Sequence, residues 1–335
     1  AVALDEVAEA LLHRVGETVR RIRGIEHVAV VQPAGKPPGI WVLPKGRLEP
    51  GEREGESTQL SVQPPTEFLR IENRALTGAP GSEAKLSLTR PLGSRHVVIE
   101  GRVPLLGEAW TGSVAVPEPA LFATTLFAEA LTRHGVTIRD EVGTSRDPLP
   151  GPLRPLASVR GPSVAEQIKV VNKESQNLHA EILLRRLGLR AFGDASVEGS
   201  LRAREVFLRS QGVRFAEAAM YDGSGLSRSA LVTARAEVDL LTAMARHPLK
   251  TAFKDSLPIA GVDGSLKRRM VGSAAQGRVF AKTGSLNHVN ALAGYVDAIS
   301  GRHFVFAIIV NHHTRPAKEA TDAMDEICAL LAGLK

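Results

Sequence analysis

Residues 281–296, "AKTGSLNHVNALAGYV", place a Lys-Thr-Gly triplet between two apolar runs. The first run is "RVFA" (278–281) and the second is "NALAGYV" (290–296), and both have the short apolar pattern of a strand. "HFVFAIIVN" (303–311) predicts a third strand, and the short connections favour an antiparallel meander. A buried lysine is costly unless it is paired. Lys282, at the inner end of its strand, therefore suggests a pocket that holds an anion.

The C-terminal segment "PAKEATDAMDEICALLAGL" (316–334) predicts a helix that covers this meander. Its apolar face contains Ala320, Met324, Ile327, Leu331 and Leu334. A helix over an antiparallel sheet predicts an α/β sandwich. The single cysteine, Cys328, excludes an intrachain disulfide and is predicted to be a small core residue.

Composition narrows the classes of function. The net charge is +6 and the pI about 9.7, but arginines are spread along the chain and aromatics make up only 4% of it, which argues against nucleic-acid binding. A cationic surface also suits a polyanionic environment such as a bacterial cell wall. No apolar run reaches the roughly 18 residues of a membrane span, and no secretory signal is recognisable.

The upstream chain divides by its patterns. Short alternating runs between residues 57 and 115 predict a β-rich segment, "PEPALFATTLFAEALTRHGV" (117–136) predicts a helix, and the Pro-rich "RDPLPGPLRPL" (146–156) predicts a domain joint. Beyond it, "SVAEQIKVVNKESQNLHAEILLRRLG" (163–188) predicts two helices that are interrupted at Ser-Gln-Asn.

Two short elements carry candidate chemistry. Ser175 and Asn177, in "KESQNLHAE", are typical of a helix cap, but they also form a Ser-x-Asn element that offers a hydroxyl and an amide. Lys282 can supply positive charge, Thr283 and Ser285 can donate hydroxyls to a carboxylate, and Gly284 permits close approach of a substrate backbone. Ser-x-Asn followed by Lys-Thr-Gly is the motif pair of penicillin-binding proteins and serine β-lactamases.

Longer segments resemble the class C low-molecular-mass penicillin-binding proteins, the D-Ala-D-Ala carboxypeptidase/endopeptidase family. These segments are "VNKESQNLHAEILLRRLG", "YDGSGLSRSALVTARAEVDLL", "LPIAGVDGSLKRR" and "AKTGSLNHVNALAGYV"; "PPTEFLRIENRALTG" and "PEPALFATTLFAEALTRHGVTI" are similar to parts of the domain that this family inserts. The resemblance implies a DD-peptidase/β-lactamase-like fold with a β-rich inserted domain, a peptidoglycan substrate ending in D-Ala-D-Ala, β-lactam binding and a periplasmic or extracytoplasmic location.

The resemblance also implies roles for individual residues. Ser175 would relay a proton to the leaving group, Asn177 would hold the substrate amide, and Lys282 would give electrostatic stabilisation. Thr283 and Ser285 would grip the terminal carboxylate. "DGSGLSR" (222–228) is similar to a loop near the site, for which we expect a structural role.

The family also needs a Ser-x-x-Lys element, whose serine forms the acyl-enzyme. The one match in the sequence, Ser82-Glu-Ala-Lys85, lies in the segment similar to the inserted domain, and we interpret it as coincidental. We therefore expect impaired turnover, together with exposed apolar area or an open sheet edge where the upstream portion would pack.

Residues 1–56 are interpreted as an incomplete Nudix-like fragment, because "GIWVLPKGRLEPGE" (39–52) resembles the start of a Nudix box with Gly46 and Glu52 in Gly-x5-Glu spacing. The acidic helix that would complete its Mg²⁺ site does not follow. The predicted domains are thus 1–56, the β-rich inserted domain 57–155 and the DD-peptidase domain 156–335.

Three hypotheses follow. The first is a serine-type D-Ala-D-Ala carboxypeptidase/endopeptidase, the second a non-catalytic binder of peptidoglycan or β-lactams, and the third, a Nudix diphosphate hydrolase. We expect no cofactor and no metal site, since the histidines (His303, His312 and His313 among them) lack ligand spacing and are expected to be solvated or packed.

Overall fold

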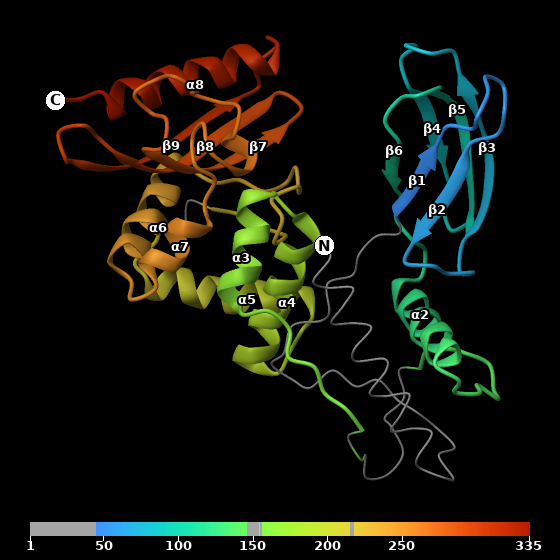
Figure 1. Ribbon diagram of the computed structural model, residues 1–335. Coiled ribbons are helices and arrows are strands. Elements are labelled where there is room, and N and C mark those ends of the chain that lie inside the picture. Colours follow the sequence, from blue (N-terminus) through green and yellow to red (C-terminus); the bar gives the residue numbers. More distant parts are fainter. Residues whose placement is uncertain (1–44, 146–153, 155, 215–217) are drawn as a thin grey trace. The chain divides into compact units, whose positions relative to one another are not determined.

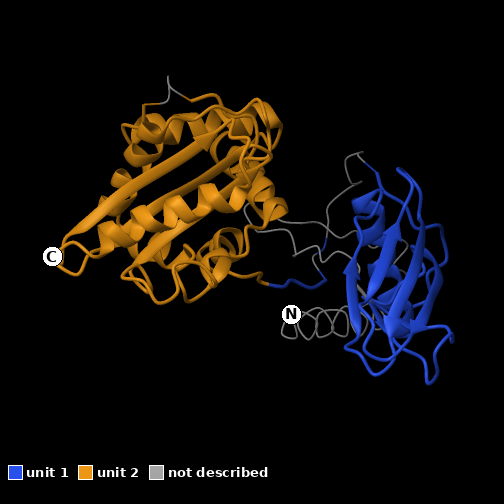
Figure 2. Ribbon diagram, turned by 90° about the horizontal axis from the view of Figure 1, so that it is seen from above, with its two compact units in different colours: residues 1–30, 40–159 blue, residues 31–39, 160–335 orange. Residues whose placement is uncertain are grey.

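The computed structural model describes residues 45–145, 154, 156–214 and 218–335. These residues form two compact units, one ending at residue 159 and the other beginning at residue 160 (Figure 2). The elements of the first unit are β1 (Lys45–Glu49), β2 (Gln59–Gln63), β3 (Arg70–Gly78), β4 (Lys85–Thr89), β5 (His96–Pro104), β6 (Trp110–Ser113) and α2 (Pro119–Arg133).

The second unit consists of helices and one sheet (Figure 1). Its elements are α3 (Val164–Lys173), α4 (Asn177–Phe192), α5 (Val197–Ser210), α6 (Ala234–Arg246), α7 (Lys250–Ser256), the 3₁₀ turn η2 (Gly264–Leu266), β7 (Val279–Leu286), β8 (Val289–Asp297), β9 (His303–Asn311) and α8 (Ala317–Ala332).

The first unit is β-rich, as its alternating runs predict. Its strands form two three-stranded sheets, one in the order β2-β1-β6 and the other in the order β3-β5-β4. β5 pairs in parallel with β3 and antiparallel with β4. Inward residues of the strands, of α2 and of the segment before β3 share one apolar core, made of Leu48, Phe68, Leu69, Ala75, Val97, Ile99, Val103 and Phe122.

The Nudix-like interpretation of residues 1–56 is not supported. Residues 1–44 lie outside the described residues, and β1, which contains Gly46, pairs with β2 and β6 of the β-rich unit. Glu52 lies in the turn between β1 and β2, and in that turn the Gly55 backbone N–H donates to the carbonyl oxygen of Thr77 on β3 (2.9 Å). A Nudix box needs a helix after this point, and the chain forms strand-like pairing there instead.

The second unit has the predicted α/β sandwich. Its sheet has the order β7-β8-β9, antiparallel throughout, so the predicted meander is confirmed. α8 packs on one face of the sheet and α6 on the other (Figure 1). The interior is built from small and branched residues of β7 and β8, including Val279, Ala281, Leu292 and Val296, against Met324 and Cys328 of α8.

The inward face of α8 differs in part from the prediction. Met324 and Cys328 are fully buried, and the Cys328 thiol has its pKa raised to about 12, mainly by that burial. Ile327, predicted on the same face, is 44% exposed and Leu334 is also exposed. Cys328 and Ala332 occupy the face instead, because residues four apart on a helix lie above one another.

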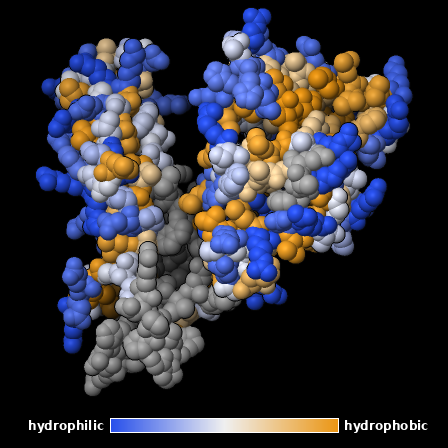
Figure 3. Space-filling view, turned by 180° about the vertical axis from the view of Figure 1, so that it is seen from behind, coloured by the Kyte–Doolittle hydropathy of each residue, from blue (hydrophilic) through white to orange (hydrophobic). Residues whose placement is uncertain are grey.

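Large apolar side chains also lie on the surface of the second unit, the larger body in Figure 3. Among them are Leu231, Leu249 and Leu330, each more than 60% exposed. Within the described ranges, β9 has no partner strand on its outer side. The sheet therefore has an unpaired edge at β9 in the part of the chain that the structure describes.

Candidate functional site

The junction between α3 and α4 presents two of the predicted site residues. α3 begins with a capping box, in which Ser163 and Glu166 satisfy each other's backbone N–H groups, and it ends at Lys173. Ser175 follows with a positive φ of 55°, and the Gln176 side chain caps α4 by accepting from the Leu178 N–H. Gln176 is therefore the cap, and the side chains of Ser175 and Asn177 remain exposed.

Ser175 and Lys282, 107 positions apart, meet in the folded chain. The Lys282 Nζ donates to the Ser175 Oγ at 2.8 Å and to the Thr283 carbonyl oxygen at 2.8 Å. Because the lysine donates, the hydroxyl hydrogen of Ser175 stays available for a second partner. The predicted pairing of the Ser-x-Asn and Lys-Thr-Gly elements is thus present for these two residues, and Asn177 is the first residue of α4, two positions after Ser175.

Among the described residues, the Lys282 ammonium has no carboxylate partner. Burial lowers the pKa of Lys282, since desolvation disfavours its charged form. Its two acceptors are both neutral oxygens, and no carboxylate pairs with it in the part of the chain that the structure describes. A half-buried ammonium with two neutral acceptors attracts an anion.

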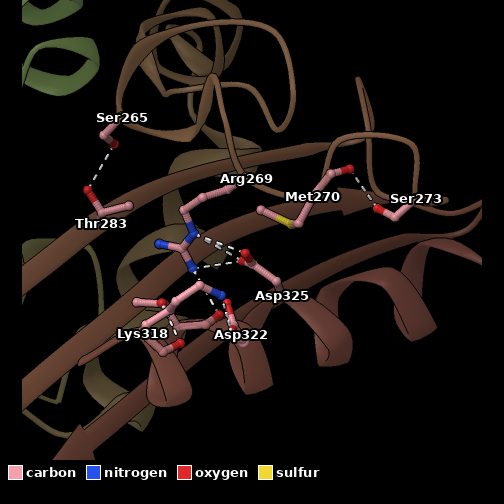
Figure 4. A network of polar contacts seen from close by, with 9 residues as sticks. Ser265, Arg269, Met270, Ser273, Thr283, Lys318, Asp322 and Asp325 are labelled. Atoms are coloured by element: carbon pink, nitrogen blue, oxygen red, sulfur yellow. Dashed lines mark hydrogen bonds and ion pairs between the residues drawn. The ribbon is translucent and has the colours of Figure 1, made fainter. Parts of the chain in front are cut away.

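Thr283 contacts a residue that the sequence did not single out. The Ser265 Oγ of η2 lies 2.9 Å from the Thr283 Oγ1, and the two hydroxyls face each other in Figure 4. The chain after η2 is fixed to α8 by Arg269, whose Nε and Nη2 both reach the Asp325 carboxylate, the shorter contact being 2.7 Å. The segment "GVDGSLKRR" therefore adds a hydroxyl to the group around Lys282.

A second ion pair fixes η2 to α3. The Lys173 Nζ donates to the Asp263 carboxylate at 2.6 Å and to the Leu257 carbonyl oxygen at 2.9 Å. Gly264 has a φ of +58°, and a Cβ there would lie 2.9 Å from the Lys173 carbonyl oxygen. This close approach requires glycine at position 264. It places η2 against the end of α3, two residues before Ser175.

Gly284 and Ser285 complete the exposed end of β7. A Cβ on Gly284 would have one neighbour, the Ala291 Cβ at 3.5 Å, so the space beside this residue is open. Thr283 and Ser285 are two residues apart and thus share one face of the strand. The Ser285 Oγ accepts from the Asn290 Nδ2 at 3.1 Å. Asn290 is buried, and its position in the apolar run "VNALAGYV" was a signal that sequence reasoning did not use.

The loop "DGSGLSR" is bound to the helices around it. The Glu181 carboxylate accepts from the N–H groups of Gly223 and Ser224, and the Arg204 guanidinium donates to the carbonyl oxygens of Met220 and Asp222. These contacts suit the structural role expected for the loop.

No group of three or more His, Cys, Asp or Glu side chains among the described residues is arranged to hold a metal ion. Glu52 therefore has no described partners for the Mg²⁺ that Nudix chemistry needs. His303 contacts Asp297, and half-buried His313 contacts Asn290. Across the same described ranges, no helix has the length and apolar character needed to cross a membrane.

Comparison with known proteins finds a matching family and several relatives. A family model described as D-Ala-D-Ala carboxypeptidase 3 (S13) matches residues 44–331, including β1 and the Lys-Thr-Gly triplet. A D-alanyl-D-alanine carboxypeptidase from an Actinomadura species is 37% identical over 285 residues, which are 83% of this chain and 52% of that protein. The D-alanyl-D-alanine carboxypeptidase DacB of Haemophilus influenzae is 30% identical over 205 residues, 60% of this chain and 42% of that one.

Solved structures agree with the fold. The crystal structure of penicillin binding protein 4 from Haemophilus influenzae superposes with a TM-score of 0.69 at 22% identity, covering 87% of this chain and 66% of that one. The chain spans about half the length of the curated relatives it matches.

Proposed function

Because the chain belongs to the D-Ala-D-Ala carboxypeptidase 3 (S13) family, we propose that the side chains around Lys282 bind the C-terminal carboxylate of a peptidoglycan stem peptide ending in D-Ala-D-Ala. The observation that carries the proposal is the half-buried Lys282 ammonium, which is hydrogen-bonded to Ser175 and Thr283 and has no carboxylate partner among the described residues. A carboxylate supplies that charge, and the hydroxyls of Thr283 and Ser285 supply donors for its two oxygens.

The remaining roles follow from position. Ser175 accepts from Lys282 and keeps its own hydrogen, so it can pass that proton to the leaving D-Ala nitrogen when the peptide bond breaks. Asn177, exposed at the start of α4, is assigned to the substrate amide, and Gly284 leaves room for the substrate backbone beside β7. Lys282 stabilises negative charge that develops in the transition state.

The acylating serine is the remaining requirement of a serine carboxypeptidase. Ser82, in the single Ser-x-x-Lys of the sequence, lies in an exposed turn before β4 and donates to the Ala79 carbonyl oxygen. No helix begins there, so Ser82 lacks the setting that the family's nucleophile has. We propose that this chain by itself binds D-Ala-D-Ala peptides and β-lactams reversibly and forms an acyl-enzyme slowly or not at all.

The family's substrate is part of the cell wall, so we assign the site to an extracytoplasmic compartment. The alternative of a non-catalytic binder uses the same residues and differs only in the acylation step.

The experiment has two readouts on the full chain. Calorimetry measures the affinity for a peptide ending in D-Ala-D-Ala and for the same peptide as its C-terminal amide. Incubation with a fluorescent penicillin, followed by intact mass, detects an acyl-enzyme. Lys282→Met removes the ammonium, and Lys318→Met is the matched control, because Lys318 lies on the exposed side of α8 in an ion pair with Asp322.

We expect the carboxylate peptide to bind at least tenfold more tightly than the amide, and Lys282→Met to abolish the difference. Lys318→Met should bind as the parent chain does. Equal affinity for the two peptides in the parent chain would refute the proposed site. A penicillin adduct that forms within seconds would refute slow acylation and, once mapped, identify the nucleophile.

A further inference from the structure

A chain of three side chains leads from Ser285 into the interior. Ser285 is exposed at the end of β7, Asn290 is its register partner on β8 and is 3% exposed, and His313 follows β9. The Asn290 Nδ2 lies 3.1 Å from the Ser285 Oγ, and its Oδ1 lies 2.8 Å from the His313 Nε2. His313 Nδ1 lies 2.9 Å from the Arg315 carbonyl oxygen.

The contacts in this group couple the orientation of the Asn290 amide to the protonation of the His313 ring. A carbonyl oxygen can only accept, so Nδ1 must carry a hydrogen that it donates to Arg315. The Asn290 amide can take two orientations, so the 2.8 Å contact fits either an Nε2–H that donates to Oδ1 or an Nδ2–H that donates to an unprotonated Nε2. With Oδ1 facing Nε2, both ring nitrogens donate and His313 is the charged imidazolium; with the amide rotated, His313 is neutral.

A neutral His313 requires a different arrangement. Its Nδ1 keeps the hydrogen for Arg315, and its Nε2 becomes an acceptor. The Asn290 amide must then rotate so that Nδ2 donates to Nε2 and Oδ1 faces Ser285. Ser285 must in turn donate its hydroxyl hydrogen to Oδ1. In the charged state, by contrast, Asn290 donates to Ser285 and the hydroxyl hydrogen remains free for a ligand.

We propose that His313 and Asn290 are positioning residues for the carboxylate site: the charge on His313 sets the Asn290 amide, and the amide decides whether Ser285 can donate to a bound carboxylate. The inference rests on the proposed function, because the carboxylate is the ligand assigned to Ser285. It predicts that the affinity for a carboxylate ligand falls as pH rises through the titration of His313.

Other charged groups adjoin His313. His288, in the turn between β7 and β8, has its Nδ1 3.0 Å from the His313 carbonyl oxygen. His312 precedes His313 in the chain, and the Arg315 guanidinium pairs with Glu319 of α8 at 3.1 Å. On β7, Lys282 is the nearest charged residue in sequence to Ser285. Among the described residues none of these groups forms an ion pair with the His313 ring, so the control variants must separate His313 from His288 and His312.

The first measurement is nuclear magnetic resonance of the full chain labelled with ¹⁵N in histidine, from about pH 5 to about pH 8, the range in which histidines change charge. Long-range ¹H–¹⁵N correlations distinguish the imidazolium from each neutral tautomer. We expect His313 to be doubly protonated at the acid end and to keep the hydrogen on Nδ1 at the alkaline end. A neutral His313 throughout, or a neutral form with the hydrogen on Nε2, would overturn the proposal.

The second measurement is the affinity for a D-Ala-D-Ala peptide and for its C-terminal amide over the same pH range. The carboxylate peptide should lose about tenfold in affinity as His313 becomes neutral, the effect of one donor to a charged ligand, while the amide should change little. His313→Gln and Ser285→Ala should each abolish the pH dependence. His312→Asn should retain it, since asparagine tolerates the positive φ of 53° at that position.

The outcomes separate the two claims. If the parent chain binds the carboxylate peptide but the pH dependence survives in His313→Gln or Ser285→Ala, the inference is wrong and the proposed function stands. If the parent chain binds neither peptide at any pH, the proposed function and the ligand role of Ser285 are both wrong, and the nitrogen spectra alone decide whether His313 and Asn290 are coupled.

Discussion

Replacing Arg269 with methionine tests whether the segment that carries Ser265 is held by its bond to α8. The Arg269 and Asp325 side chains are 20% and 18% exposed, and the guanidinium makes two contacts with one carboxylate oxygen, one with the other and one with the Thr321 carbonyl oxygen (Figure 4). Methionine retains the apolar stem but leaves the Asp325 charge without a partner.

Removing one partner of a buried pair costs about 3–5 kcal/mol, whereas an exposed pair contributes about 0–1 kcal/mol. Because about one fifth of each side chain is exposed, we expect Arg269→Met to lower the free energy of unfolding by about 3 kcal/mol. A lysine at the same position keeps the charge but loses the two-pronged geometry, and Arg269→Lys should cost about 1–2 kcal/mol. Lys318, on the same helix as Asp325, pairs with Asp322, and the two side chains are 82% and 52% exposed. The free energy of unfolding of Lys318→Met should therefore stay within about 0.5 kcal/mol of that of the parent chain.

The assay is urea unfolding, monitored by far-ultraviolet circular dichroism. The double variant Arg269→Met/Asp325→Leu is a further test. Because the double variant removes both charges, it should recover part of the loss. The reasoning would be refuted if Arg269→Met cost no more than Lys318→Met, or if the double variant were less stable than Arg269→Met alone.

The remaining predictions concern the sheet. Burial lowers the pKa of Lys282, so the unfolded chain holds this proton to higher pH than the folded chain does, and raising pH towards the ordinary lysine range of about 10 stabilises the parent chain. Lys282→Met should therefore be at least as stable as the parent chain at neutral pH, and the difference between their free energies of unfolding should narrow near pH 10. A difference that widens towards pH 10 in chemical unfolding would contradict this. In Gly294→Ala, the new Cβ would lie 2.1 Å from the Phe280 carbonyl oxygen, which should cost about 3 kcal/mol or more, whereas Gly284→Ala meets its nearest neighbour at 3.5 Å and should fold normally. Equal melting temperatures for the two alanine variants would refute the predicted clash between a Cβ at position 294 of β8 and the backbone of β7.

Local patterns were enough to predict the three strands and several helices of the second unit. The apolar runs of β7, β8 and β9, the interruption between α3 and α4, and the helical spacing of α8 all depend on neighbours within a few residues. The motif pair likewise predicted that Ser175 and Lys282 act together, and their contact is present.

The parts that were missed depend on contacts between distant segments. The sequence does not show that β5 joins β3 in parallel, because the choice of partner strand depends on packing across the whole unit. Ser265 lies in a turn with no periodic pattern, and it reaches Thr283 only because Lys173 and Arg269 hold its flanks. The Nudix-like interpretation failed because a short Gly-x5-Glu spacing also fits a strand followed by a turn.

The group around Lys282 draws Ser175, Ser265 and Lys282 from three separate stretches of the chain. Such a site does not exist in the unfolded polypeptide, so any molecule that occupies it binds the folded form alone. Occupancy at a hundred times the dissociation constant would then add about 2.7 kcal/mol to the free energy of unfolding. A melting curve recorded against a collection of D-amino-acid peptides would thus rank them by affinity without a label, a substrate turnover or knowledge of the nucleophile.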